Sequence, residues 1–530
     1  MDPFQCAVST NSTTATVIAL GFLLGLIGIY LIQWAFGSHH DPREPPIIRS
    51  WIPILGHIGA LLVKGNRHFT HLCQQYKYPI FTVPLLNGSK IYVVASPAVA
   101  AQVQRNQKTM TFDLMATDFS IRMTGLGPEV RKLLEADFTS KDKIKKDGCF
   151  LNTMHHHFVT SLGPGGKLDD IALVQLNAVA KSVGNLATDQ TVDMFVWIRQ
   201  TISMASMLAL YGPKNIFETH PELEECFCQW ESDLPLLMTG FMPSLLAPTA
   251  QAAVERIKRA LVEYAEKGGY KQASEIIQER LRIHTDNCFS LQQTAELELP
   301  IMHGVLANVT PTAFWLLTRL YTTPSLLSTV RYELEQSDIV RIDGMDRFIS
   351  ISKLKKRCPS LSSAFRECLR YYAFFTNVRM ITEDTVIDGN LLKKGHVTQI
   401  CLSALHSDPE IWGSDVDDFD PLRFVTTPFG TIKSLTPNEP SKNVHAAAFR
   451  GFGGGRGLCP GRHLARAETT GFAALIVLGW DLQSDDGTEL KMPRIKEVKI
   501  PSSVAKPDRD LKVSLRRRKG LESVQWCFEL

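Results

Sequence analysis

The sequence has little excess charge of either sign and no C-x-x-C cysteine pair. Its formal net charge is only +3 over 530 residues, and its basic clusters are not interleaved with aromatic residues, so nucleic acid is not an expected partner. The eleven cysteines are odd in number and form no C-x-x-C pair, which argues against a disulfide framework and a zinc ribbon. With 44% hydrophobic and 21% charged residues, the composition predicts a globular protein in a reducing compartment.

Long uncharged apolar runs are also scarce, and the sequence has one. Residues 17–36 carry no charge and could span a ~30 Å hydrocarbon core as a helix. A cleaved signal peptide is the alternative, but it should have a basic start, whereas the only charge before this run is Asp2. Several basic residues follow the run, which places the body in the cytoplasm. We therefore expect a luminal N-terminus at 1–16, an anchor in the endoplasmic reticulum membrane at 17–36 and a proline-rich linker at 37–56.

The remaining sequence predicts a mainly α protein with small β-sheets, an α+β fold. Two short β-rich runs, 80–85 and 91–94, flank the hairpin signal Asn87-Gly88-Ser89. Helical periodicity then dominates, for example at 252–264, 293–321 and 326–336. Further β-rich runs come late, at 385–400 and 498–515. We expect these late runs to pair with the early ones, which favours a single catalytic domain over residues 57–530.

The most informative stretch is a glycine-rich loop with a single cysteine. Residues 452–461 read Phe-Gly-Gly-Gly-Arg-Gly-Leu-Cys-Pro-Gly and contain Cys459. Glycine permits positive φ and close backbone approach, so such a loop can lie beneath a planar ligand with its N–H groups directed at one sulfur. No register gives G-x-G-x-x-G and no G-K-[ST] follows, which excludes dinucleotide-binding and P-loop interpretations. Taken alone, the loop could equally be a flexible linker.

This loop resembles the haem-binding loop of the cytochrome P450 family, Phe-x-x-Gly-x-Arg-x-Cys-x-Gly. The matching positions are Phe452, Gly455, Cys459 and Gly461. The family's arginine position holds glycine here, and Arg456 stands one place earlier. The resemblance implies that Cys459 is the axial ligand of the haem iron and that Phe452, Gly455 and Arg456 contact the haem.

Other family motifs occur in the same order along the chain. Glu367 and Arg370 match Glu-x-x-Arg, and Arg423 lies in a segment that resembles the downstream arginine segment. Residues at i and i+3 share a helix face, so Glu367 and Arg370 can pair, and Arg423 could complete a three-member ion network. Alone, Glu-x-x-Arg has almost no specificity, because surface pairs at this spacing are abundant. The resemblance implies a structural network that supports the haem-binding core.

The helix expected on the oxygen side of the haem lacks the family's acidic residue. Ala307 stands where the acid belongs and Asn308 where the threonine belongs, with Thr310 as the next candidate proton donor. This variant resembles the branch that contains cholesterol 7α-hydroxylase, sterol 12α-hydroxylase and prostacyclin synthase. Pro311 clashes with the carbonyl four residues back, so we expect the helix to kink or open at Ala307 to Asn308. The alternative role for Asn308 is structural compensation of the proline.

Three adjacent histidines have a structural and a functional interpretation. His155, His156 and His157 cannot share the i, i+4 face that zinc prefers, so a solvated helix is expected. By family position, one of them or Arg379 could contact a haem propionate, and Arg379 is the stronger candidate.

A set of basic residues also has two interpretations. It could steer an acidic reductase or simply be solvated, and it comprises Lys353, Lys355, Lys356, Arg357, Arg450, Arg462 and Arg466.

The resemblance implies a haem-thiolate monooxygenase with haem b as its cofactor. Its expected partners are the membrane, an apolar small molecule, NADPH-cytochrome P450 reductase and cytochrome b5. The loop's form is similar to fungal enzymes of secondary metabolism, which implies a terpenoid, meroterpenoid or polyketide substrate, with sterol as the alternative. The missing acid also suits a haem-thiolate isomerase that rearranges a peroxide without a reductase. A haem-binding protein without enzymatic activity is the third interpretation.

Overall fold

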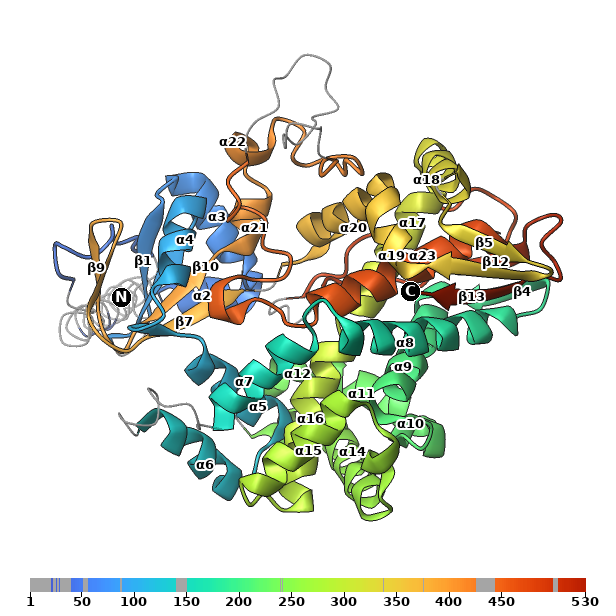
Figure 1. Ribbon diagram of the computed structural model, residues 1–530. Coiled ribbons are helices and arrows are strands. Elements are labelled where there is room, and N and C mark those ends of the chain that lie inside the picture. The colour runs from blue at the N-terminus through green and yellow to red at the C-terminus, as the bar shows by residue number, and fades with distance from the viewer. Residues whose placement is uncertain are drawn as a thin grey trace, which may run out of the picture. The chain divides into compact units, whose positions relative to one another are not determined.

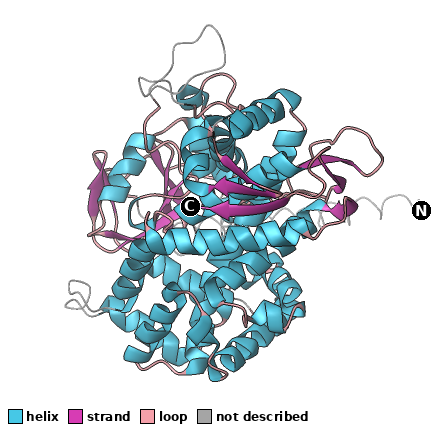
Figure 2. Ribbon diagram, turned by 45° about the vertical axis from the view of Figure 1, so that its right-hand side comes forward, coloured by secondary structure: helices cyan, strands magenta, loops and turns pink. Residues whose placement is uncertain are grey.

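The computed structural model describes most of the chain after residue 39, in two compact units. The described residues are 21, 25, 28, 40–50, 56–85, 88–139, 150–238, 240, 242–336, 338–374, 376–425, 444–498 and 504–530. One unit comprises Met1–Thr111 and Thr376–Ala404, and the other comprises Phe112–Phe375 and Leu405–Leu530. Helices form most of the described chain and strands form small sheets, which confirms a helix-rich α+β fold (Figures 1 and 2).

The first unit is built on a five-stranded sheet in the order β1-β2-β10-β7-β3. The predicted hairpin is confirmed, because β1 and β2 pair antiparallel; Asn87 of its turn lies outside the described residues. Val397 to Ile400 in β10 pair parallel with Ile91 to Val94 in β2, so a late β run does join the early one. The elements are α2 (Gly56–Lys64), α3 (Arg67–Tyr76), α4 (Pro97–Arg105), β1 (Ile80–Pro84), β2 (Lys90–Val94), β3 (Met110–Thr111), β7 (Asn377–Ile381), β8 (Thr385–Ile387), β9 (Asn390–Leu392) and β10 (Val397–Ile400).

The second unit is mainly helical. Its N-terminal helices are α5 (Asp113–Thr124), α6 (Pro128–Thr139), α7 (Phe150–Ser161), α8 (Gly166–Gly184), α9 (Met194–Tyr211), α10 (Ile216–Thr219), α11 (Glu222–Ser232), α12 (Leu234–Leu237), α13 (Pro243–Leu246) and α14 (Pro248–Glu266). They are followed by η2 (Gly269–Gln272), α15 (Glu275–Asp286), α16 (Leu291–Leu306), α17 (Val309–Tyr321), α18 (Pro324–Gln336), α19 (Ile351–Arg357), α20 (Pro359–Tyr372), α22 (Pro409–Trp412), η3 (Gly455–Gly457) and α23 (Arg462–Gly479). A short helix, α21 (Leu402–His406), crosses from the first unit into the second.

Two three-stranded sheets complete the second unit. Their strands are β4 (Asp189–Asp193), β5 (Val340–Asp343), β6 (Asp346–Ser350), β11 (Trp480–Ser484), β12 (Lys512–Arg517) and β13 (Gln525–Glu529). The orders are β11-β12-β4 and β13-β6-β5. The expectation that the run ending at Leu515 pairs with the early strands is therefore wrong, because β12 pairs with β11 and β4 instead. Alternation alone defines a strand but not its partner.

The predicted linker at 37–56 is more than a spacer where it is described. Ile48 N–H donates to Thr82 O at 2.9 Å, and Thr82 N–H donates to Pro46 O at 2.8 Å. Glu44 is buried and lies 2.7 Å from Lys90 Nζ on β2. Backbone bonds and a buried ion pair thus fix this segment to the sheet of the first unit.

The predicted anchor at 17–36 lies outside the described residues, apart from three isolated positions. Among the helices that the structure describes, none has the length and apolar composition needed to cross a bilayer.

A buried carboxyl group joins three helices of the second unit. Glu468 on α23 accepts hydrogen bonds from Ser206 Oγ on α9 at 3.0 Å and from Gln175 Nε2 on α8. Burial raises the pKa of Glu468 to about 8, although the two hydrogen bonds act in the opposite direction. The native state therefore keeps this group protonated at neutral pH, whereas an unfolded chain ionises it near its ordinary pKa.

This difference predicts a stability that falls as pH rises. Between about pH 4.5 and 8, unfolding releases the Glu468 proton, so every increase in pH favours the unfolded chain, by at most about 1.4 kcal/mol per unit. Glu468→Gln removes this titration. We expect its thermal midpoint, measured relative to that of wild type, to gain progressively from pH 5 to 8. Glu279→Gln, at a carboxyl whose pKa is lowered by Arg282, should show no such gain in that window. Parallel curves for Glu468→Gln and wild type would contradict the prediction.

Candidate active site

The loop that carries Cys459 is folded by its own backbone bonds. Cys459 N–H donates to Phe452 O at 2.9 Å, which closes the loop, and Leu458 N–H donates to Gly455 O at 3.0 Å. Gly453 and Gly455 have φ values of 76° and 61°, in the left-handed region that side chains disfavour. The glycines therefore allow a tight turn immediately before α23, with the cysteine at its end.

Opposing effects act on the thiol of Cys459. Burial raises its pKa above the ordinary value, while the backbone amides of Gly461 and Arg462 and the charge of Arg462 lower it. These amides belong to the start of α23, an 18-residue helix whose N-terminus favours negative charge. The sulfur thus lies in a half-buried position with hydrogen-bond donors suited to a thiolate.

The loop rests on α20. The ring of Phe452 lies 6.2 Å from the ring of Phe365, centroid to centroid. A Cβ added at Gly451 would lie 2.8 Å from Leu369 Cβ and 2.8 Å from Phe449 Cζ. The glycine thus permits a close approach between the loop and the helix that a larger residue would prevent.

Gly451→Ala should therefore displace the cysteine loop. Because Leu369 Cβ is fixed to the helix backbone, the added methyl group must move the loop, at a cost of about 1–3 kcal/mol. We expect purified Gly451→Ala to contain less haem per polypeptide and to lose it at a lower temperature than wild type. The matched control is Gly184→Ala on α8, where an added Cβ meets nothing within 4 Å. Equal haem content in both variants would contradict the steric argument.

Glu367, Arg370 and Arg423 lie together and are buried. Arg370 Nη2 lies 2.6 Å from Glu367 Oε1, and Arg423 Nε lies 3.3 Å from the same oxygen. Arg370 also donates to the carbonyls of residues 406, 416 and 418, and Arg423 donates to those of 412, 415 and 418. The network therefore attaches the segment 406–423 to α20, the helix that also supports the cysteine loop.

His406 was not singled out from the sequence, but this residue connects the network to the loop. Its carbonyl accepts from Arg370, and its Nε2 accepts from Arg450 N–H at 3.0 Å. Burial lowers the pKa of His406 to about 3, so the ring is neutral and can act as an acceptor. Arg450 stands just before the loop in the sequence, but only the fold shows that it contacts His406.

The distal helix is interrupted where Pro311 predicts an interruption. α16 ends at Leu306, α17 begins at Val309, and Ala307 and Asn308 form a turn between them. Asn308 Oδ1 accepts from Val504 N–H at 2.9 Å, so only its NH₂ group remains as a donor. Thr310 is buried, and no described group forms a hydrogen bond with its Oγ1.

Arg456 is paired within the second unit. Its Nε lies 2.8 Å from Asp113 Oδ2 on α5, and its Nη2 donates to Asn152 Oδ1 on α7. Burial lowers the pKa of His155, and the positive charge of Arg456 lowers it further. Arg379 lies on β7 of the first unit, where it is buried and donates to Val378 O at 2.8 Å.

The expectation of a solvated face for all three histidines is wrong for one of them. His156 is exposed and His155 is half-buried, but His157 is buried, and its Nε2–H donates to Ile276 O on α15 at 3.0 Å. Consecutive helix positions point in different directions, so packing of α7 on α15 buries one ring of the three.

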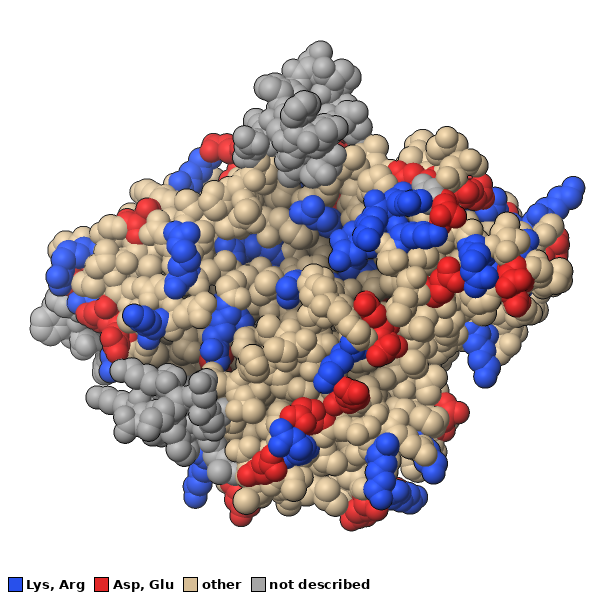
Figure 3. Space-filling view, in the orientation of Figure 1, with Lys and Arg blue, Asp and Glu red and all other residues tan. Residues whose placement is uncertain are grey.

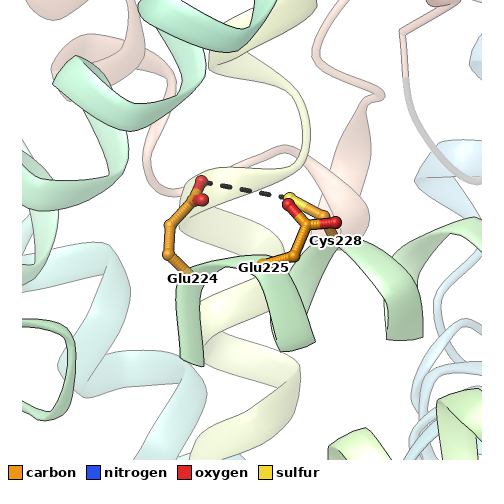
Figure 4. Close-up of side chains that lie close together, drawn as sticks. All are labelled: Glu224, Glu225 and Cys228. Carbon is orange, nitrogen blue, oxygen red and sulfur yellow. Dashed lines mark hydrogen bonds between the residues drawn. The ribbon is translucent and has the colours of Figure 1, made fainter. Parts of the chain in front are cut away.

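A carboxylate and thiol group on α11 does not form a convincing metal site. Glu224, Glu225 and Cys228 converge there, and Cys228 Sγ lies 3.9 Å from Glu224 Oε1 (Figure 4). Arg199 on α9 neutralises both carboxylates, at 2.9 Å from each. Burial raises the pKa of Cys228 far above its ordinary value, which disfavours a metal-binding thiolate. Among the described residues no other such group occurs.

The fold and the cysteine loop agree with comparison to known proteins. The family model for cytochrome P450 matches residues 236–513, just over half of the chain, and the chain belongs to this family. It is 30% identical over 524 residues to cytochrome P450 monooxygenase nodJ of Hypoxylon pulicicidum, covering 97% of this chain and 96% of that protein. It is also 28% identical to a cytochrome P450 monooxygenase of Gibberella zeae, over 98% of both chains. A third relative, 5-beta-cholestane-3-alpha,7-alpha-diol 12-alpha-hydroxylase of Sus scrofa, is 24% identical over 88% of this chain and 92% of its own.

The protein is therefore an oxidoreductase of the monooxygenase type whose cofactor is haem with a cysteine thiolate ligand. The described residues fit such a group. A single sulfur at the start of a long helix, with amide donors directed at it, is a suitable ligand set for an iron that needs one protein ligand on this side.

Proposed function

We propose that Cys459 is the thiolate ligand and that the chain hydroxylates a large apolar molecule, with dioxygen and with electrons from NADPH. The observation that carries this proposal is the closed glycine loop, which presents a half-buried cysteine at the start of α23. The catalytic domain is assigned to residues 57–530. When bound, the haem supplies oxygen activation and C–H oxidation.

The chain's own residues hold the cofactor and donate protons. The amides of Gly461 and Arg462 stabilise negative charge on the sulfur. Phe452, Gly455 and Ala307 provide close contact surfaces for the planar group, and Arg456 and Arg379 are the candidate partners of its carboxylates. Thr310 Oγ and the Asn308 NH₂ group are the candidate hydrogen-bond donors on the oxygen side.

The cysteine loop, the relatives and the N-terminal sequence support a substrate class and a location. The form of the cysteine loop, which is similar to that of fungal enzymes of secondary metabolism, supports a terpenoid, meroterpenoid or polyketide, and two of the relatives are fungal monooxygenases. Similarity to a 12-alpha-hydroxylase of a cholestane diol supports sterol as the alternative. The run at 17–36 supports a single anchor in the endoplasmic reticulum membrane, from which an apolar substrate can partition into the protein.

A basic surface beside the cysteine loop is suited to an acidic reductase. Lys355, Lys356 and Arg357 are exposed on α19, and Arg466 on α23 donates to Lys355 O at 3.3 Å. Lys and Arg side chains gather around α19 on the face shown in Figure 3. Such a surface steers a partner of opposite charge and makes electron delivery sensitive to ionic strength. Cytochrome b5 is a further candidate for the same surface.

The test is NADPH oxidation by the full-length holoprotein with NADPH-cytochrome P450 reductase. We expect oxidation that requires both proteins and dioxygen, and hydroxylated products from a panel of terpenoids and sterols. A haem-thiolate isomerase would instead convert an organic peroxide without reductase. Failure of the wild type to oxidise NADPH would contradict the monooxygenase proposal.

A further inference from the structure

A cavity of about 250 Å³ lies in the second unit where the distal helix is interrupted. It is large enough for several water molecules and has polar walls. Its lining includes Ala307 and Thr310 from the interrupted helix, Glu231 from α11, Arg199 from α9, and Lys506 and Arg509 from the segment after residue 503. The cavity thus connects the position of the missing acid with charged side chains from other elements.

Three carboxyl groups line this cavity. Two of them accept hydrogen bonds from backbone amides, and the third is buried and paired with a lysine. Asp510 accepts from the first amides of α9, and Asp508 is exposed and accepts from Arg494 N–H. Glu231 is only 7% exposed and lies 2.7 Å from Lys506 Nζ, whose side chain is 27% exposed. A path from solvent can therefore pass the half-buried lysine to reach the buried carboxylate.

The helix presents unsatisfied polar groups on one face. His303, Ala307 and Thr310 recur at i, i+4 and i+7. His303 Nε2 and Thr310 Oγ1 are buried, and neither has a hydrogen-bond partner among the described residues. Glu231 and Lys506 line the same cavity as Ala307 and Thr310, so these groups lie close to this face. A buried hydroxyl without a partner beside a polar cavity is well placed for bound water.

The distal-helix variant also holds Lys506 in place. Asn308 Oδ1 accepts from Val504 N–H, and Trp315 Nε1–H donates to Ala505 O at 2.7 Å. These two bonds fix the residues immediately before Lys506 against α17. The asparagine that replaces the usual threonine therefore positions the lysine that pairs with Glu231.

We propose that Glu231, held by Lys506, supplies the acid that the distal helix lacks and passes protons through this cavity to Thr310. The inference rests on the proposed monooxygenase function. Each turnover converts NADPH, a proton, dioxygen and R–H into NADP⁺, water and R–OH. The path carries the two protons that end on the oxygen atom released as water, and NADPH supplies both electrons. Glu231 on α11 is a proton relay, because its carboxylate takes up a proton that enters from solvent and passes it towards Thr310, and Lys506 is its positioning residue.

The test uses the full-length holoprotein with reductase and measures NADPH oxidation under dioxygen without organic substrate, in H₂O and D₂O. We expect Glu231→Gln to lower the rate by about tenfold to a hundredfold and to raise the solvent isotope effect. Glu231→Asp should recover part of the rate. Glu225→Gln, an exposed carboxylate on the same helix, should match wild type. Glu231→Gln combined with Thr310→Val should be no slower than Thr310→Val alone, because both residues act in one path.

Either of two outcomes overturns the inference while leaving the proposed function intact. One is a Glu231→Gln protein with wild-type rate and isotope effect. The other is a double variant whose losses multiply. A wild type that oxidises no NADPH would instead contradict the proposed function itself. The reduced, carbon-monoxide difference spectrum of each variant verifies that the haem site is formed.

Discussion

Cys459→Ala should abolish the strongly red-shifted Soret band of the reduced, carbon-monoxide-treated protein. The band depends on thiolate ligation, and alanine offers no ligand at the start of α23. Burial raises the pKa of this thiol, whereas the amides of Gly461 and Arg462 lower it, so a thiolate ligand depends on this position at the start of α23. We expect complete loss of the shifted band and of NADPH-dependent turnover.

Cys527→Ala is the matched control, since Cys527 is also half-buried and lies on β13. It should retain the wild-type spectrum. A shifted band in Cys459→Ala would assign the thiolate to another cysteine and refute the proposed role of the loop. An unshifted band in both wild type and variant would show that the axial ligand is not a thiolate.

Glu367→Gln should destabilise the holoprotein more than any surface change. Glu367 is fully buried between Arg370 and Arg423, so loss of its charge leaves the buried Arg370 without a carboxylate partner and Arg423 with Asp415 alone. Breaking a buried ion pair costs about 3–5 kcal/mol. The segment 406–423 and the cysteine loop share α20 as their support, so haem retention should fail together with folding. We expect the temperature at which the Soret absorbance is half lost to fall by about 3–5 °C.

Asp118→Asn provides the comparison for an exposed pair. Asp118 lies 2.8 Å from Arg122, and both side chains are about 40% exposed. Solvent screening reduces such a pair to less than about 1 kcal/mol, so the midpoint should move by less than about 1 °C. A shift for Glu367→Gln as small as this would show that the buried network contributes little to stability.

Local patterns predicted the parts of the site that depend on neighbouring residues. The glycine spacing before Cys459 predicted a tight loop, and Pro311 predicted the interruption at Ala307 and Asn308, because both effects act within one turn of the backbone. The i, i+3 spacing placed Glu367 and Arg370 on one helix face. The loop closes, the helix is interrupted and the two side chains pair in the structure.

Features that depend on contacts between distant segments could not be predicted from local sequence patterns. Glu231 and Lys506 are 275 positions apart, and neither belongs to a recognisable motif. The burial of His157 depends on how α7 packs on α15. Side chains one residue apart on a helix point in different directions, so this packing decides which of the three rings is covered. The partner of β12 was likewise predicted incorrectly, since strand alternation carries no information on pairing.

The parallel pairing of β10 with β2 also governs how the first unit can be made on the ribosome. β2 is complete by Val94, but its second neighbour is supplied by residues 397–400, roughly 300 residues later. At about 5–20 residues per second, the edge of β2 waits on the order of 15–60 seconds for that neighbour. During this interval a largely apolar strand edge is open to other nascent chains, which is a common origin of aggregation. Slow translation and a lack of chaperone protection for the early hairpin should therefore limit the yield of this protein in a foreign host.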